Sequence, residues 1–218
     1  MIPDSSKLVA LSELANLETG TLHTDKFEYE NILYGKSLKF KALASRIIAC
    51  RKCSGLNIKR FTEGCPGWGN LNSDIFFIGQ SLHEPGMLSG LPFIQGSGYS
   101  IAAALRLSGL KWTDVFFSNV VHCHPENNRP STEAEKQNCL PYLISELDIV
   151  KPKLIVAMGN DAKQAFEVVK EWLILDKSTR IFKCKHPASF CYGAPEQRID
   201  WIIKLSQQID KAKGTKNE

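Results

Sequence analysis

The chain has 218 residues, 43% of them hydrophobic, and a formal net charge of +4 from 27 Lys and Arg against 23 Asp and Glu. This is enough apolar material for one well-buried domain, and the small positive excess permits an anionic partner without requiring one. No basic, apolar signal peptide opens the sequence and no apolar run is long enough to cross a bilayer, so we expect a cytoplasmic protein without a membrane partner.

The expected elements begin with an acidic helical arm over residues 1–37, in which apolar residues recur with helical spacing between 8 and 17. A helix is predicted at 38–48, and a Gly- and Pro-rich loop at 64–70. Four nearly continuous apolar runs then predict strands that are covered on both faces: 74–79, 114–121, 153–158 and 180–185. Helical patterns alternate with these strands: 99–107, 132–149, 161–173 and 195–209. A basic polar tail, 211–218, follows the main domain of residues 38–210.

This alternation predicts an α/β fold, a three-layer α/β/α sandwich around a central four-stranded, mostly parallel sheet. Thr132 and Glu135 form a capping-box signature at the start of the helix at 132–149, and Pro141 is expected to kink that helix. Ligands of such sheets bind beyond the carboxyl ends of the strands. The chemistry should therefore gather at four strand ends: 79–81, 119–123, 159–160 and 185–187.

The seven cysteines are an odd number for a disulfide framework, and clustered cysteines in a cytosolic chain more often bind metal. Cys50 and Cys53 form a Cys-x2-Cys knuckle that can place two thiolates on one metal. Cys123 and Cys139 could supply two more, and the fifteen residues between them suit a wide loop around a four-iron, four-sulfur (4Fe-4S) cluster better than the tight second knuckle usual for zinc. A cluster, a zinc ion and unrelated buried thiols remain three interpretations. The other cysteines are Cys65, Cys184 and Cys191, of which Cys184 suits the core.

Several motifs occur together in a fixed order. They are Cys-x2-Cys, the Gly-rich loop, a strand ending at Gly79, Gly90-Leu91-Pro92-Phe93, Asn119-Val120-Val121 followed by Cys123, Asn128-Arg129, Cys139 and a late His186-Pro187. Over residues 46–205 this order and spacing resemble the uracil-DNA glycosylase superfamily, and most of all its iron–sulfur-containing family 4. The resemblance implies a monofunctional DNA repair glycosylase that flips uracil, or a related deaminated base, out of DNA and hydrolyses the N-glycosidic bond to leave an abasic site.

The resemblance also implies a 4Fe-4S cluster, with zinc as the alternative, and a monomer that binds single- or double-stranded DNA. The cluster ligands would be Cys50, Cys53, Cys123 and Cys139. Such a metal centre would be structural and would pin the loop that carries Asn128 and Arg129. Those two residues would contact the DNA backbone, and the rim would be extended by Lys52, Lys59 and Arg60.

The resemblance assigns three residues to the extruded base. Phe93 would stack on it, because every base offers a π-face. Asn119 would read uracil, because its amide can pair with both N3–H and O4, a pattern that cytosine reverses. His186 would donate a hydrogen bond to uracil O2 and so stabilise the negative charge on the departing base. Each of the three, taken alone, would equally suit a structural role. The further residues placed at the base are Gly79, Ser81 and Ser189.

Two aromatic residues, Phe190 and Tyr192, follow the late His-Pro motif directly. They would wedge into the minor groove and hold the base out of the duplex, because apolar wedges commonly separate base steps there. Packing inside the protein would explain both residues equally well.

The strand-end motif departs from the family. Family 4 has Gly-Glu-Ala-Pro-Gly where this chain has Gly79-Gln80-Ser81-Leu82-His83, and glutamine can position water but cannot take its proton. Three outcomes stay open: water only needs positioning, His83 or Glu84 takes over as the base, or the protein binds DNA without efficient excision. The catalytic candidates are Gln80, His83, Glu84 and His186. An α/β enzyme for a small anion at Gly79 or 96–98 is disfavoured, because P-loop and dinucleotide motifs are absent.

Overall fold

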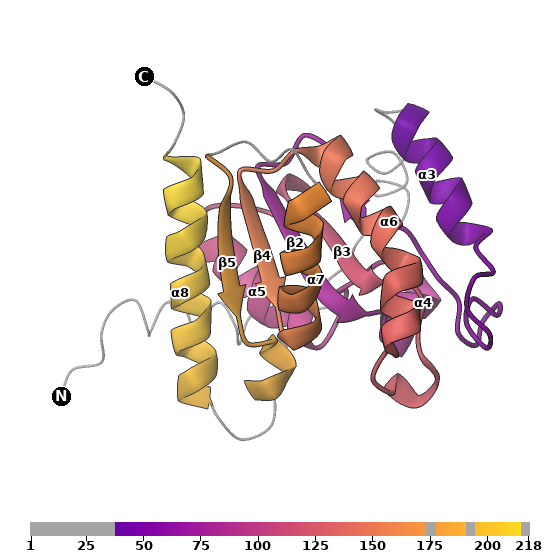
Figure 1. The fold of residues 1–218 in the computed structure, drawn as a ribbon. Coiled ribbons are helices and arrows are strands. Elements are labelled where there is room, and N and C mark those ends of the chain that lie inside the picture. The colour runs from indigo at the N-terminus through magenta and orange to yellow at the C-terminus, as the bar shows by residue number, and fades with distance from the viewer. Residues whose placement is uncertain (1–37, 173–177, 191–194, 215–218) are drawn as a thin grey trace.

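The computed structural model describes residues 38–172, 178–190 and 195–214, so the predicted arm at 1–37 and Tyr192 lie outside the described residues (Figure 1). The strands are β1 (Trp68–Gly69), β2 (Ile75–Ser81), β3 (Phe116–Val121), β4 (Leu154–Met158) and β5 (Arg180–Cys184). The α-helices are α3 (Leu38–Ile48), α4 (Glu84–Ser89), α5 (Ser97–Leu107), α6 (Glu133–Val150), α7 (Asn160–Trp172) and α8 (Pro195–Lys213). Short 3-10 helices are η1 (Trp112–Asp114), η2 (Glu126–Asn128) and η3 (Pro187–Phe190).

The strands form one sheet in the order β1-β3-β2-β4-β5, in which β2 to β5 are parallel and β1 is antiparallel to β3. The chain runs from β2 to β3 on one side and then returns to β4 on the other side of β2. The direction of the connections therefore reverses between β2 and β4, and ligands of open parallel sheets bind at the carboxyl ends of the strands beside such a reversal. Figure 1 shows these ends at the lower edge of the sheet.

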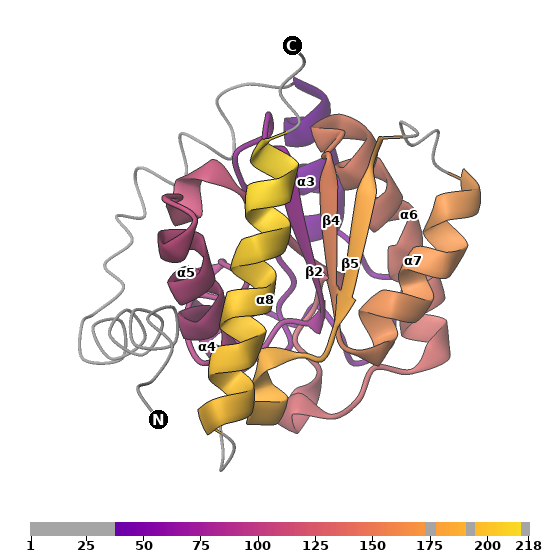
Figure 2. The ribbon, with the colours of Figure 1, turned by 90° about the vertical axis from the view of Figure 1, so that its left-hand side faces the viewer.

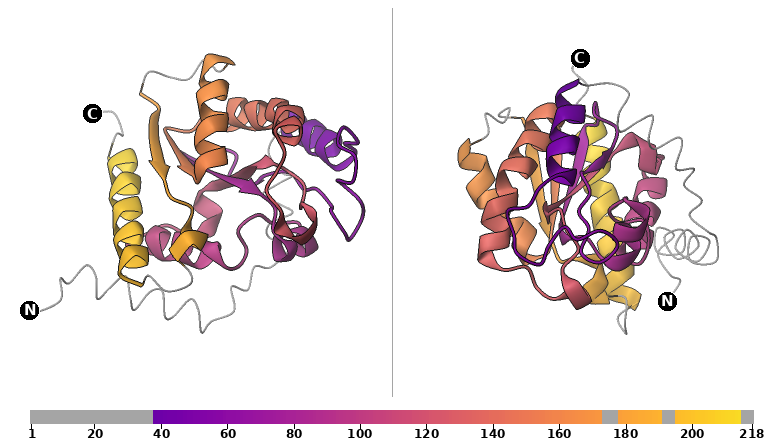
Figure 3. Two further views of the ribbon diagram at one scale, coloured as in Figure 1. Left: turned by 60° about the horizontal axis from the view of Figure 1, so that its bottom comes forward. Right: turned by 90° about the vertical axis from the view of Figure 1, so that its right-hand side faces the viewer.

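Helices cover both faces of the sheet, which confirms the predicted α/β fold and its three layers (Figure 2). One face carries α5 and α8, which pack against each other, and the other carries α6 and α7, with α3 beside α6 (Figures 2 and 3). None of the helices in the described ranges is both long and apolar enough to span a membrane.

Aromatic pairs join the two strands that carry the site, β2 and β3. Their parallel register places Phe76 beside Phe116 and Phe77 beside Phe117, with ring centroids 5.1 Å apart in both pairs. Trp68 of β1 stacks on Phe117 at 4.9 Å. All five side chains are fully buried. The apolar runs of the sequence lack alternation because these strands are covered on both faces.

The predicted capping box is present at the start of α6. The Thr132 hydroxyl accepts a hydrogen bond from the Glu135 backbone N–H at 3.2 Å, and the Glu135 carboxylate accepts one from the Thr132 N–H at 2.8 Å. These two bonds satisfy backbone donors that have no partner within the helix. Pro141 lies inside α6, and the kink expected there stays a prediction.

The sequence predicts neither β1 nor α4, nor the short 3-10 helices. The sheet has five strands rather than four, because β1 forms within the expected Gly- and Pro-rich loop, where two residues are too few to produce an apolar run. Helix α4 has only six residues and contains Pro85 and Gly86, so it lacks a helical pattern. In addition, α8 continues to Lys213 and takes in the first residues of the expected tail.

Candidate active site and cysteine cluster

Gly79 and Asn119 lie side by side near the carboxyl ends of β2 and β3, where the parallel register pairs them. A side chain at position 79 would place its Cβ 2.6 Å from Asn119 Oδ1 and 2.4 Å from the Phe93 ring. Both distances are too short for any residue but glycine. Gly79 therefore leaves a space in which the predicted asparagine and phenylalanine meet.

The backbone holds the Phe93 ring over this space. Phe93 has a φ of 63°, a left-handed conformation that is costly for a bulky residue. The segment is fixed on both sides, because Trp68 Nε1 donates to the Pro92 carbonyl at 2.8 Å and a Cβ at Gly98 would lie 1.8 Å from the Phe93 carbonyl oxygen. The ring is 6% exposed, so it lies inside the protein against Gly79 and Asn119 and does not project into solvent.

Asn119 ends in a buried acceptor that is not satisfied. The residue is 3% exposed, and Oδ1 has no hydrogen-bond partner among the described residues. A buried carbonyl without a partner costs about 1–3 kcal/mol, and folded proteins normally avoid it. Oδ1 lies beside Gly79 and the Phe93 ring, and a ligand that brought an N–H to this oxygen would satisfy it.

His186 reaches the same region from the loop after β5. Its ring centroid lies 6.3 Å from that of Phe93. Nδ1 accepts a hydrogen bond from the Ala188 N–H at 3.2 Å, so the proton of the neutral ring is on Nε2. Ser189 donates from both N and Oγ to the His186 carbonyl, at 3.0 and 2.6 Å, which fixes the turn. Burial, and after it the nearby His83, lowers the pKa of His186 to about 4.

The candidate groups for water activation differ in their surroundings. Gln80 is half-buried at the end of β2, His83 is half-buried just before α4, and Glu84 is exposed in the first turn of α4. Burial, and then His124, lowers the pKa of His83, so the ring is neutral at pH 7 and can accept a proton. His83 also interacts electrostatically with His186, whereas Glu84 lies at the surface.

The residues after the late His-Pro motif correct one prediction. Phe190 is 7% exposed and belongs to the hydrophobic core, with Lys185 Nζ 5.9 Å from its ring centroid. A wedge must project from the surface, so the prediction for Phe190 is wrong: its aromatic character does not reveal which way the ring points. Ser189 is exposed and Ser81 is half-buried, and their contacts with a base stay predictions.

The four predicted ligand cysteines gather beside β3. Cys123 follows β3 and Cys139 lies on α6, both buried, while Cys50 and Cys53 are half-buried in the loop after α3. Burial, followed by the thiols of Cys139, Cys50 and Cys53, raises the pKa of Cys123 to about 12. The four groups are therefore within electrostatic reach of one another. Among the residues that the structure describes, no three His, Cys, Asp or Glu side chains are grouped to hold a single metal ion.

The sequence does not reveal a buried charge pair, His122 and Glu146. The Glu146 carboxylate accepts hydrogen bonds from the Gly67 N–H at 2.7 Å and from the Ser118 hydroxyl, and lies 3.2 Å from His122 Nε2. Burial by itself lowers the pKa of His122, but Glu146 and then Cys139 outweigh burial and raise it to about 10. For Cys139 burial acts in the opposite direction and raises the thiol pKa, but the His122 ring outweighs burial, so the pKa of Cys139 is lowered overall. The pair thus links β3 to one of the four cysteines.

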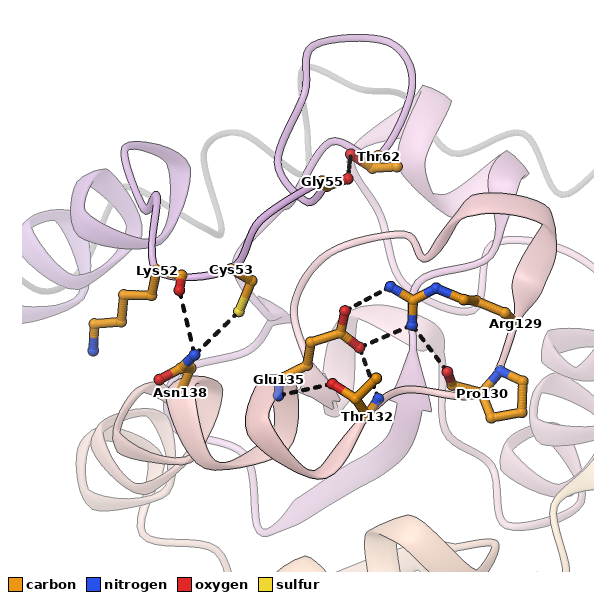
Figure 4. Close-up of polar contacts among 9 residues, drawn as sticks. All are labelled: Lys52, Cys53, Gly55, Thr62, Arg129, Pro130, Thr132, Glu135 and Asn138. Carbon is orange, nitrogen blue, oxygen red and sulfur yellow. Dashed lines mark hydrogen bonds and ion pairs between the residues drawn. The ribbon is translucent and has the colours of Figure 1, made fainter.

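The predicted backbone-contacting residues lie on an exposed loop. Arg129 donates two hydrogen bonds to the Glu135 carboxylate, at 3.0 and 2.6 Å, and one to the Pro130 carbonyl at 3.0 Å (Figure 4). Its side chain remains 40% exposed. Asn127 and Asn128 are exposed and have left-handed backbone conformations, with φ of 55° and 53°. Phosphate contacts of Asn128 and Arg129 stay predictions, and Glu135 offsets part of the Arg129 charge.

Comparisons with known proteins agree with this geometry. The model of the Uracil DNA glycosylase superfamily matches residues 66–209. A type-4 uracil-DNA glycosylase of Archaeoglobus fulgidus is 35% identical over 177 residues, which cover 73% of this chain and 86% of the relative. One of Sulfurisphaera tokodaii is 30% identical over 173 residues, 72% of this chain and 78% of the relative. A type-5 uracil-DNA glycosylase of Pyrobaculum aerophilum is 28% identical over 174 residues, 64% of this chain and 72% of the relative. The family model spans the whole sheet and its strand-end site, and the chain belongs to the uracil-DNA glycosylase superfamily.

Proposed function

We propose that the protein is a monofunctional uracil-DNA glycosylase, which flips uracil or a related deaminated base out of DNA and leaves an abasic site. The observation that carries the proposal is the buried Oδ1 of Asn119, which has no hydrogen-bond partner among the described residues and lies beside Gly79 and the Phe93 ring. Uracil carries a hydrogen on N3, whereas the same nitrogen of cytosine is an acceptor and would leave Oδ1 unpaired. Because one chain supplies every residue of the site, we propose that it works as a monomer.

The side chains divide the reaction among them. Hydrolysis breaks the bond between C1′ of the sugar and N1 of uracil, whose electron pair departs with the base, while a water oxygen bonds to C1′ and gives up a proton. Asn119 pairs with N3–H and O4, and Phe93 supports the face of the ring. Neutral His186 donates from Nε2 to O2, where negative charge develops as the bond breaks.

Base excision is the direct test of this proposal. The protein is incubated with oligonucleotides that carry one uracil, either as single strands or in duplexes, and abasic sites are then cleaved with alkali. We expect cleavage at the uracil position alone. The control is a double variant, Asn119→Ala with His186→Ala. Cleavage no greater than that of the control would overturn the proposal. The alternative, a DNA-binding protein that does not excise bases, would then be favoured.

His83 is the group that we expect to take the proton of the attacking water, because Gln80 cannot and Glu84 is exposed. His83→Gln should lower the single-turnover rate about 100-fold, within the range of about 100- to 10,000-fold for a general base, without changing DNA affinity. The native rate should fall as the pH drops through the lowered pKa of His83, and His83→Gln should lose this dependence. Glu84→Gln is the matched control and should keep the native rate. If Glu84→Gln excised uracil slowly while His83→Gln kept the native rate, Glu84 would be the group that takes the proton of the attacking water.

We also propose that the thiolates of Cys50, Cys53, Cys123 and Cys139 hold a 4Fe-4S cluster. The support is their mutual proximity and the all-thiol donor set. Asn138 adds to it, because Nδ2 donates to the Cys53 sulfur at 3.4 Å, the kind of outer contact that stabilises a ligand thiolate (Figure 4). The cluster would supply a structural cross-link between the loop after α3, β3 and α6, and no step of base excision.

Loss of one cluster ligand should be visible. Anaerobically purified native protein should be brown and contain iron and sulfide, and Cys139→Ser should be colourless and melt at a lower temperature. Cys184→Ser is the matched control, because Cys184 is equally buried but lies on β5, and it should stay brown. If the native protein were colourless and contained stoichiometric zinc, the four cysteines would bind zinc and not a cluster.

A further inference from the structure

An exposed turn between the Cys-x2-Cys motif and β1 combines positive charge with apolar side chains. It consists of Ile58, Lys59, Arg60 and Phe61, and we call it the 58–61 turn. Ile58 is 50% exposed and Phe61 52%, and both basic residues between them are exposed. Residues 50–62 contain four Lys and Arg and no Asp or Glu. The turn therefore presents two apolar and two positively charged side chains within four consecutive residues.

Hydrogen bonds of the buried Thr62 side chain hold the backbone of the turn in place. Thr62 is 1% exposed; its hydroxyl donates to the Gly55 carbonyl at 2.9 Å and accepts from the Ile58 N–H at 3.1 Å (Figure 4). The backbone closes the turn as well, since the N–H groups of Phe61 and Thr62 donate to the Ile58 carbonyl at 3.0 and 2.9 Å. The exposed side chains therefore stand on a fixed frame, which lowers the entropy cost of binding a partner.

The frame contains local strain. Asn57 and Arg60 have left-handed backbone conformations, with φ of 59° and 60°. The Asn57 amide compensates with buried bonds, accepting from the Gly64 N–H at 2.9 Å and donating to the Cys50 carbonyl at 2.8 Å, and the Arg60 N–H donates to the Glu63 carboxylate at 2.9 Å. Conformations of this kind persist where the surroundings enforce them, commonly at binding sites.

The turn lies at the same end of the sheet as Gly79 and Asn119. The His124 N–H donates to the Glu63 carbonyl at 3.2 Å, and Gly64 pairs with Cys123, so the end of the turn is tied to the segment that directly follows β3. Figures 1 and 3 show segment 50–64 beside α4 and η2, around the edge where the parallel strands end.

We infer that the 58–61 turn is a second DNA-contacting element, which binds the strand beyond the flipped nucleotide and favours unpaired DNA. Lys59 and Arg60 contact phosphates, and Phe61 packs on the face of a base that is no longer stacked in a duplex. The inference rests on the proposed glycosylase function for its partner. DNA is favoured over an acidic protein or a lipid surface because the turn is tied to the segment after β3, which carries Asn119, and because its charge is complementary to the backbone.

Binding to DNA without uracil tests the inference separately from excision. Dissociation constants are measured by fluorescence anisotropy, over a series of salt concentrations, for a uracil-free single strand and the matching duplex. Phe61→Ala should weaken single-strand binding about tenfold, weaken duplex binding much less and leave the salt dependence unchanged. Lys59→Ala with Arg60→Ala should reduce the slope of log K against log salt by about 1.4 on single strands, about 0.7 for each lost phosphate contact.

Matched controls come from the first turn of α3, at the end of that helix away from the Cys-x2-Cys loop. Leu38→Ala removes an apolar side chain that is 85% exposed, and Lys39→Ala with Lys41→Ala removes two exposed charges; both should bind like the native protein. Equal losses in the turn and control variants, or no loss in either, would overturn the inference, as would a turn variant that lost affinity only for anionic lipid vesicles. Because no chemistry is involved, the result holds even if excision is absent.

Discussion

Replacing Asn119 with alanine is expected to lower uracil excision about 1,000-fold while changing the stability of the protein by less than about 1 kcal/mol. The loss in rate follows because a pocket built to pair with polar groups discriminates strongly through them, and an unpaired uracil N3–H and O4 would each carry a desolvation cost. The small change in stability follows because the variant removes a buried oxygen that no described residue hydrogen-bonds, which offsets the packing that is lost.

Excision under single-turnover conditions and thermal unfolding measure the two halves of this prediction. Asn72→Ala is the matched control, because Asn72 is exposed in the segment before β2, away from the strand-end site, and its removal should change neither quantity. An Asn119→Ala protein that excised uracil at the native rate would remove the base-reading role. A large drop in stability would mean that Asn119 serves the fold instead.

His186→Ala is expected to slow excision about 100- to 1,000-fold, the usual effect of removing one donor that stabilises a developing anion. The pKa of His186 is about 4, so the ring is neutral and donates from Nε2 throughout the physiological range, and the rate should show no inflection from His186 above about pH 5. The same shift makes the folded chain lose stability as the pH falls from about 6.5 through 4, because the unfolded histidine binds the proton more readily.

The conservative variant His186→Gln separates donation from charge. Its amide keeps an N–H near the position of Nε2 without a titratable ring, so it should retain more activity than His186→Ala and lack the stability change below pH 6.5. A native rate that instead rose with protonation of His186 would contradict the neutral-donor role, because a cationic donor would then be the active form.

Much of the fold follows from local signals in the sequence. α3 begins and ends where its apolar spacing predicts, and α6 begins at the capping box of Thr132 and Glu135. β2, β3 and β4 are visible because burial on both faces leaves unbroken apolar runs. β5 is an edge strand in which Ile181 and Lys183 are exposed, so the prediction that it is covered on both faces is wrong. β1 and α4 are missed because two and six residues carry too little pattern, and their positions depend on long-range contacts instead.

The site divides in the same way. Gly79, Asn119 and His186 could be placed because their motifs mark strand ends, and strand ends share one edge of the sheet. Phe93 lies in the loop between α4 and α5, and only the order of the motifs indicated its position. Burial could not be read from residue type, so Phe190 looks like a wedge but packs in the core. Glu146 looks like an ordinary polar position of a helix, and only the fold brings it against His122.

The strand order of the sheet has a further consequence for how the chain becomes active during folding. Asn119 is on β3 near one edge, Gly79 is on β2 in the middle, and His186 follows β5 at the other edge. Parallel strands of this kind pair only after long loops have closed, which makes them slow to assemble. The leaving-group donor arrives with the last strand of the sheet, so a nascent or partly folded chain cannot yet cut bases from DNA. Recovery of excision after dilution from denaturant should accordingly lag behind recovery of helical signal.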